Sequence, residues 1–271
     1  MTSSDQQPPI LLHKHHAAPS AFTPGNLLRE ARRQRNLAEA TVPPVCILDP
    51  DGDIVRYLRN AGRAERLRNW GCYHTDLYVF EQDGIEYGIV GCAVGSAFAV
   101  LIAEEFFASG CRLLLSMTSA GHILPVQAPP YFVLIDRALR DEGTSYHYLP
   151  PSEFSDADPE LVAAARQACV AANVALQIGA SWTTDAPFRE TEQAIAAAVQ
   201  LQILAVEMEA AALYSFARAR NRPVVCFAHV TNQMARIDGD FEKGTFNGAE
   251  MSLRLMRLVA ASICERSQMR P

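Results

Sequence analysis

Two acidic side chains, Glu207 and Glu209, lie between two strongly apolar stretches of the sequence. Residues 203–206 read Ile-Leu-Ala-Val and residues 210–212 are three alanines, so a buried strand is expected to meet a helix here. A helix N-terminus favours acidic residues, but a buried carboxylate is costly unless it has a hydrogen-bond partner. Two vicinal hydroxyl groups of a ligand would provide such a partner.

A polar turn at residues 49–53, Asp-Pro-Asp-Gly-Asp, follows the apolar run 45–48. Gly52 lets the backbone approach an oxyanion closely, and Arg56 offers a planar fork of hydrogen-bond donors. Taken alone, the same pattern also describes an ordinary turn followed by a surface arginine.

Alternating strand and helix patterns would hold these residues in place. Short apolar runs predict strands at 45–48, 77–81, 86–92, 112–118, 131–136, 176–181 and 224–230. Caps and helical spacing predict helices at 27–36, 97–109, 158–173, 191–202, 209–220 and 247–264. Several strands are apolar throughout, so we expect an α/β fold of one domain whose central sheet is flanked by helices on both faces.

Composition excludes several classes of protein. The 271 residues carry a formal net charge of −6, which gives no basic excess for binding nucleic acid. No apolar run has the roughly 18–20 residues of a membrane span, and the first five residues do not resemble a secretion signal. Seven widely spaced cysteines without a Cys-x-x-Cys pair suggest reduced thiols. We therefore expect a cytoplasmic protein that binds neither nucleic acid nor membranes.

Residues 1–44 form a Pro-rich N-terminal arm. His13, His15 and His16 lie in it, but a Pro-rich segment gives them no defined geometry, so we expect no metal site.

The segment 205–214, Ala-Val-Glu-Met-Glu-Ala-Ala-Ala-Leu-Tyr, resembles the ribose-binding signature of the nucleoside phosphorylase family, the branch that contains uridine phosphorylase and the trimeric or hexameric purine enzymes. The turn at 48–56, the glycine-rich stretch 84–95 and the strand end 115–121 are similar to three further parts of that family. The resemblance spans residues 45–264. It implies a catalytic domain at 45–271 with a mixed, distorted barrel-like sheet.

The resemblance also implies roles for individual residues. Glu209 would bind the 2′- and 3′-hydroxyls of ribose, with Met208 under the sugar and Glu207 beside it. The Gly52 amide and Arg56 would hold phosphate, and a hydroxyl at the end of strand 112–118 would touch phosphate or ribose. The expected substrate-binding residues are Gly52, Arg56, Thr118, Ser119, Gly121, Phe188, Arg189, Glu207, Met208 and Glu209, and the expected catalytic residues are Glu209, Asn232 and Arg56.

The phosphate site departs from the family pattern. Ser116 stands where these phosphorylases usually carry a second phosphate arginine, and the arginine that a neighbouring subunit usually contributes falls near Tyr73 and His74. Hydrolytic relatives, the nucleosidases, also lack these arginines. We favour phosphorolysis, because Gly52 and Arg56 provide one charge-assisted clamp, with hydrolysis by water as the alternative.

The base side of the site favours a pyrimidine. Purine-cleaving relatives carry an aspartate at the place of Asn232, and an amide cannot act as that acid. Phe188 could stack on the base and Arg189 could donate to a carbonyl oxygen. We therefore expect a uridine-like nucleoside to be cleaved to free base and ribose 1-phosphate.

The expected mechanism relies on preorganised electrostatics around the sugar cation. It requires no metal or organic cofactor, only inorganic phosphate as co-substrate. The resemblance implies a homo-oligomer, from dimer to hexamer, with the arm a plausible interface element. A catalytically silent nucleoside-binding or storage homologue is a further alternative, since a shared fold does not guarantee shared chemistry.

Overall fold

The computed structural model describes residues 7–234 and 238–266, so the first six residues of the arm lie outside it. Ten strands form one sheet: β1 (Val45–Asp49), β2 (Glu65–Arg66), β3 (Tyr78–Gln82), β4 (Ile85–Gly91), β5 (Leu113–His122), β6 (Tyr131–Asp141), β7 (Phe154–Asp156), β8 (Gln177–Thr184), β9 (Ile203–Glu207) and β10 (Val224–Asn232).

The α-helices of the described residues are α1 (Pro24–Arg35), α2 (Asp53–Asn60), α3 (Ser96–Ala108), α4 (Pro159–Ala171), α5 (Glu192–Gln200), α6 (Ala210–Arg220) and α7 (Ala249–Arg266). The described residues also contain four short 3-10 helices: η1 (Pro9–Leu11), η2 (Ser145–His147), η3 (Pro187–Arg189) and η4 (Thr245–Gly248). None of the helices described in this chain is both long enough and apolar enough to span a bilayer.

The sheet is mixed and partly closed. Nine of its strands follow the order β10-β6-β8-β9-β5-β1-β4-β3-β2, and β7 pairs with β6 beside them. Because β10 also pairs with β5, the strands β10, β6, β8, β9 and β5 form a ring. β1, β5 and β10 are parallel, while β9 runs antiparallel to β5. The carboxyl ends of β1, β5 and β10 therefore meet at one edge, close to the end of β9.

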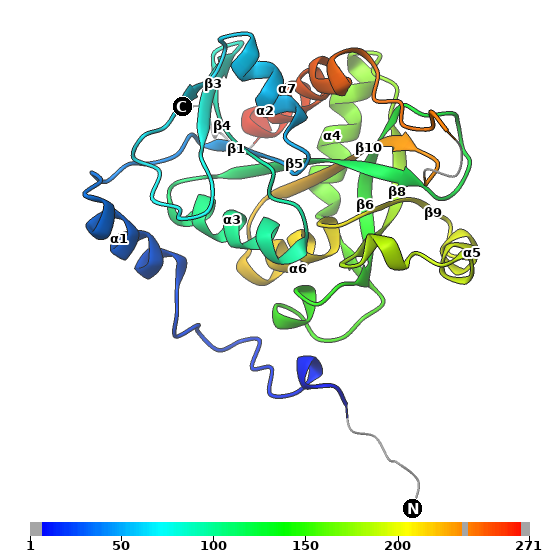
Figure 1. Ribbon diagram of the computed structural model, residues 1–271, viewed down its shortest axis with the longest axis horizontal. Coiled ribbons are helices and arrows are strands. Elements are labelled where there is room, and N and C mark those ends of the chain that lie inside the picture. Colours follow the sequence, from blue (N-terminus) through cyan, green and yellow to red (C-terminus); the bar gives the residue numbers. More distant parts are fainter. Residues whose placement is uncertain (1–6, 235–237, 267–271) are drawn as a thin grey trace, which may run out of the picture.

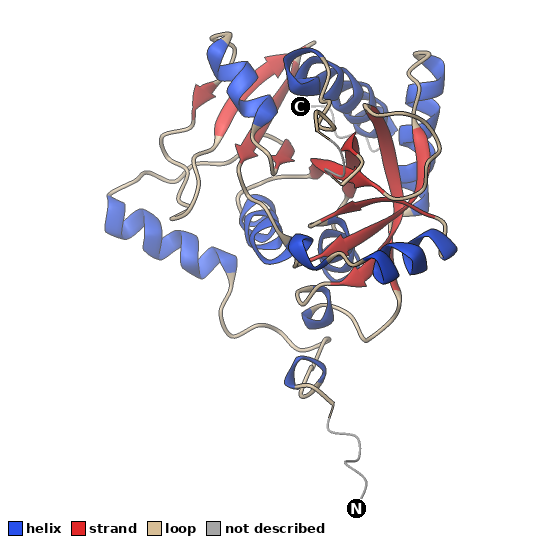
Figure 2. Ribbon diagram, turned by 45° about the vertical axis from the view of Figure 1, so that its right-hand side comes forward, coloured by secondary structure: helices blue, strands red, loops and turns tan. Residues whose placement is uncertain are grey.

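Helices cover both faces of this sheet (Figures 1 and 2). One buried cluster joins the sheet to α3 and α6, and a second joins it to α2, α4 and α7. This arrangement confirms the predicted α/β fold with a mixed, barrel-like sheet between helical layers. Most predicted elements are present, with strands β5 and β6 extending further than their apolar runs.

Helix α2 was not predicted, because the polar turn hides its start. Gly52 precedes the helix with a φ of 75°, and it has no side chain that could cap the first turn. The carboxylate of Asp49 accepts from the Val55 N–H at 2.9 Å instead. The helix is held by an apolar side formed by Ile54, Val55 and Leu58.

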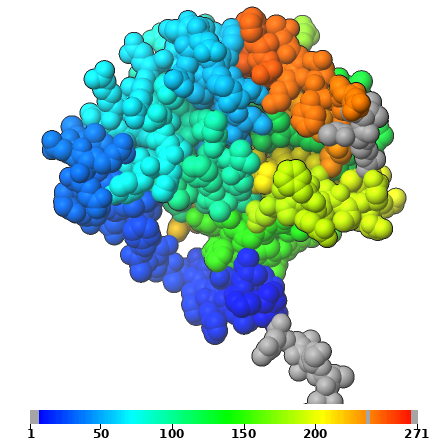
Figure 3. All heavy atoms as spheres, viewed as in Figure 1, coloured from blue at the N-terminus to red at the C-terminus, as the bar shows by residue number. Residues whose placement is uncertain are grey.

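From residue 7 to the end of α1, the N-terminal arm lies along the outside of the molecule (Figure 3). Helix α1 starts earlier than predicted, because Thr23 caps it by accepting from the Asn26 N–H and Pro24 fits its first turn. Its buried Leu28 and Ala31 face the body of the protein, where α1 packs on α3. The His16 ring donates to the Tyr146 carbonyl oxygen at 3.2 Å, which fixes a second point of the arm.

Candidate active site

Glu209 lies between β9 and α6 with its side chain buried. Only 1% of the residue is exposed. Its Oε1 accepts from the Gly95 N–H at 2.7 Å, and Gly95 has a φ of 93°, in the turn between β4 and α3. Its Oε2 is buried and has no hydrogen-bond partner. The turn at Gly95 thus holds one carboxylate oxygen, and the other oxygen can still accept a hydrogen bond.

Burial, followed by the charge of nearby Glu207, raises the pKa of Glu209 to about 8. The Gly95 N–H opposes this shift, and so does the nearby Thr118 hydroxyl, although it makes no hydrogen bond to Oε2. At neutral pH these surroundings therefore favour a protonated Glu209. A ligand that donates hydrogen bonds to Oε2 would favour the charged form.

Glu207 has a different environment, because donors of the protein satisfy both its oxygens. Oε1 accepts from the hydroxyls of Ser181 at 2.9 Å and Thr183 at 2.5 Å. Oε2 accepts from the N–H groups of Glu209 and Ala210, each at 2.7 Å. Glu207 therefore holds the first turn of α6, and with it the backbone of Glu209, against β8. Its expected contact with substrate stays a prediction.

Met208 is half-buried between the two acids. Its carbonyl oxygen accepts from the Ser96 hydroxyl at 2.8 Å. This bond ties the segment to the first residue of α3.

Asp51 reaches from the β1–α2 turn to the end of β5. Its Oδ2 accepts from the Ser119 N–H at 2.6 Å. The Gly52 N–H donates to the Asp49 carbonyl oxygen at 2.8 Å, so it closes the turn. Burial raises the pKa of Asp49 to about 7. Two groups expected to hold phosphate, the Gly52 amide and the Ser119 end of β5, thus have partners within the chain.

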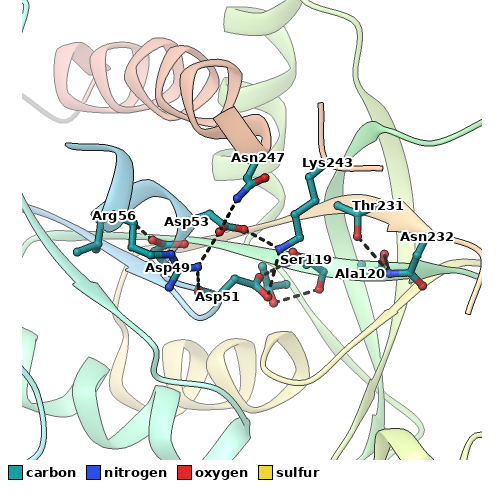
Figure 4. A network of polar contacts seen from close by, with 12 residues as sticks. Asp49, Asp51, Asp53, Arg56, Ser119, Ala120, Thr231, Asn232, Lys243 and Asn247 are labelled. Atoms are coloured by element: carbon teal, nitrogen blue, oxygen red, sulfur yellow. Dashed lines mark hydrogen bonds and ion pairs between the residues drawn. The ribbon is translucent and has the colours of Figure 1, made fainter. Parts of the chain in front are cut away.

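Asp51, Asp53, Arg56, Lys243 and Asn247 form a polar cluster, in which Asp53 pairs with both cationic side chains (Figure 4). It accepts from Lys243 Nζ at 2.6 Å, from Arg56 Nη2 at 2.7 Å and from Asn247 Nδ2 at 3.2 Å. Arg56 also donates to the Asp51 carbonyl oxygen at 2.7 Å. Although burial alone would raise the pKa of Asp53, the bonds from Lys243 and Arg56 lower it.

This cluster can be reached from solvent. Arg56 and Asp53 line a cavity of about 670 Å³ beside Tyr57. Lys243 lines another of about 550 Å³ together with His229. Burial, and then the charge of Lys243, lowers the pKa of His229 to about 4, so this histidine is neutral at physiological pH.

Thr118, Ser119 and Gly121 follow one another along β5, and Gly121 pairs with Asn232 of β10. A Cβ on Gly121 would lie 2.5 Å from the Met234 sulfur and 3.1 Å from Val206 Cγ1, so a larger residue would have to shift these two side chains. Asn232 is buried, donates to the Thr231 hydroxyl at 3.1 Å and accepts from the Met234 N–H at 2.9 Å. The expected sugar, phosphate and base-side residues of β5, β9 and β10 therefore lie at one edge of the sheet.

Phe188 and Arg189 belong to η3, after β8. Phe188 is 100% exposed. A fully exposed ring does not pack against the residues around Glu209, so stacking on a base held there would require η3 to move.

Sequence reasoning missed Lys243 and the contacts of the three aspartates. Lys243 lies 124 residues after Ser119 along the chain, in an irregular segment without a local pattern. The predicted cap of the last helix, Asn247, donates to Asp53 instead, and α7 begins at Ala249. The alternation of Asp49, Asp51 and Asp53 was the one available signal.

Comparison with known proteins gives a consistent result. Residues 44–263 match the family described as "Phosphorylase superfamily". A guanosine phosphorylase of Halorubrum lacusprofundi is 25% identical over 172 residues, which are 62% of this chain and 67% of that protein.

Solved structures are similar in fold. A uridine phosphorylase from Vibrio fischeri has a TM-score of 0.70 at 19% identity, covering 86% of this chain and 99% of the other. An AMP nucleosidase from Bacteroides thetaiotaomicron also has a TM-score of 0.70 at 19% identity, covering 91% and 100%. A 5′-methylthioadenosine/S-adenosyl homocysteine nucleosidase from Campylobacter jejuni has a TM-score of 0.65 at 18% identity, covering 80% and 98%.

Proposed function

The chain belongs to the phosphorylase superfamily, and from this premise we propose that it cleaves the N-glycosidic bond of a nucleoside. One observation carries the proposal: Glu209 is buried, and its Oε2 is left without a partner. A buried carboxylate oxygen is costly unless it accepts a hydrogen bond. The 2′- and 3′-hydroxyls of ribose would complete it.

The protein's part in the reaction is mainly electrostatic. Positive charge grows on the ribose ring as the bond to the base stretches. Glu209, ionised by its contact with the hydroxyls, places a negative charge beside that cation, and Gly95 fixes the orientation of the carboxylate. Such preorganised charge is usually the largest contribution to the rate.

A pyrimidine is the leaving base that we propose. Asn232 lies at the base side in this proposal, and its amide can donate to a carbonyl oxygen but cannot protonate a purine nitrogen. The guanosine phosphorylase that the chain resembles is named for a purine nucleoside, so guanosine belongs in any test beside uridine.

The experiment is a nucleoside panel with and without inorganic phosphate, with free base and sugar product measured separately. We expect uridine to be cleaved by the wild-type protein and not by Glu209→Ala. Asp83→Asn is the matched control, because Asp83 lies in the distant turn between β3 and β4 and pairs with Arg257. Measurable nucleoside binding without turnover of any nucleoside would refute the proposal and favour a silent homologue.

A further inference from the structure

Three aspartates of the β1–α2 turn each occupy a donor that an incoming oxyanion would need. Asp49 accepts from the Val55 N–H in the first turn of α2, where a helix would otherwise attract an anion. Asp51 accepts from the Ser119 N–H at the end of β5. Asp53 accepts from both cations of the cluster, Lys243 and Arg56.

We infer that the carboxylate of Asp51 is an internal occupant of the anion position at the end of β5, and that it excludes phosphate and leaves water as the acceptor. This inference rests on the proposed function and specifies its second substrate. It replaces the phosphorolysis expected from Gly52 and Arg56.

Charge is the main reason. A phosphate placed on the Ser119 N–H would have to displace Asp51 or share the site with it, and like charges in contact are strongly unfavourable. Lys243 Nζ lies 4.0 Å from Asp51 Oδ1 but 2.6 Å from Asp53 Oδ2. Arg56 is also paired with Asp53. Neither cation is therefore free to offset a second anion.

Access is not the obstacle. The side chains of Asp51 and Arg56 are 32% and 54% exposed. A small ion can reach this turn from solvent, so the contacts of the three aspartates decide whether it binds. Ser116, which is buried and uncharged, adds no cation from β5.

A neutral water molecule is not repelled by the carboxylate of Asp51 and needs no cation to offset a charge. Its oxygen bonds to ribose C1′ while the C1′–N bond breaks, and the electron pair of that bond leaves with the base. The proton lost by the water is returned to the departing nitrogen. The products are free base and free ribose.

The test measures phosphate binding by calorimetry, in the absence of nucleoside, for three proteins. Asp51→Asn removes the charge but keeps an acceptor for the Ser119 N–H. Asp51→Ala removes both and opens the site. Asp83→Asn removes one charge from the distant β3–β4 turn and is the control. Thermal unfolding without phosphate verifies that each variant is folded.

We expect no measurable phosphate binding by the wild type or the control. Asp51→Ala should bind phosphate with an affinity at least about tenfold above the upper limit that the titration sets for the wild type, with Asp51→Asn in between, because a like charge has been removed from the site. Wild-type base release should be independent of phosphate, and the sugar product should be ribose.

Two results would overturn the inference: phosphate binding by the wild type that equals that of Asp51→Ala, or base release by the wild type that requires phosphate. The proposed function fails separately. If no nucleoside is cleaved but Asp51→Ala gains phosphate binding, the exclusion of phosphate by Asp51 stands and the enzymatic assignment falls.

Discussion

Replacing Glu209 with glutamine should change how the stability of the protein depends on pH. Burial raises the pKa of Glu209 from 4.5 to about 8. The folded protein therefore keeps a proton at pH values where the unfolded chain has lost it. The resulting stabilisation is complete below about pH 4.5 and is lost as the pH rises through about 8.

The magnitude follows from that interval. At about 1.4 kcal/mol per pKa unit, a rise from 4.5 to about 8 corresponds to several kcal/mol of unfolding free energy between the ends of the window. Glutamine does not ionise and still offers Gly95 an acceptor. Its amide adds a buried donor, at a cost of about 1–3 kcal/mol that does not depend on pH.

Denaturant unfolding at about pH 5 and about pH 9 measures the effect. The free energy of the wild type relative to Glu209→Gln should fall by several kcal/mol from the lower pH to the higher, and the constant cost of the amide cancels in this comparison. Asp49, whose pKa is also raised by burial, contributes the same trend to both proteins. Parallel stability curves for the two proteins would refute the account of Glu209 as a buried, proton-holding acid.

Three further predictions concern Glu209 and the residues expected to act with it. Nucleoside binding near pH 7 should release protons, because ribose hydroxyls favour ionised Glu209, and calorimetry in two buffers of different ionisation enthalpy should detect this; zero net release would contradict it. Thr183→Val removes a donor to Glu207 and the acceptor of the Ala211 N–H, so it should lower the unfolding free energy by about 1–3 kcal/mol or more and reduce kcat/KM. Unchanged activity would argue against Glu207 as a positioning residue. Phe188→Ala should change stability by less than about 0.5 kcal/mol, because the ring is fully exposed, but should raise KM, and an unchanged KM would remove Phe188 from the base site.

The fold could be predicted to a large extent because its elements carry strong local signals. The apolar runs of β1 and β10 and the Asp158-Pro159 start of α4 mark their elements directly. Helix α2 lacked such a signal, since its cap comes from Asp49 rather than from the residue before the helix. The closure of the ring by β10 and β5 depends on pairing between distant segments, which local patterns do not encode.

The candidate site, like the fold, could be predicted only in part from the sequence. Burial of Glu209 could be anticipated because both neighbouring segments are apolar. Its sequence neighbour Glu207 has the same local environment, yet it is satisfied by Ser181 and Thr183, which β8 contributes from elsewhere in the chain. The family resemblance implied that Gly52 and Arg56 hold phosphate, which stays a prediction, and only three-dimensional contacts identify the aspartates and Lys243 that pair with this turn.

The most direct test of the central claim compares the binding of uridine and 2′,3′-dideoxyuridine to the wild type and to Glu209→Gln. If Glu209 accepts from the ribose hydroxyls, the wild type should prefer uridine by about a hundredfold or more, since hydrogen bonds to a charged group contribute about 1.5–3 kcal/mol each. Most of that preference should disappear in Glu209→Gln. An equal preference in both proteins would contradict the assignment of Glu209 to the sugar.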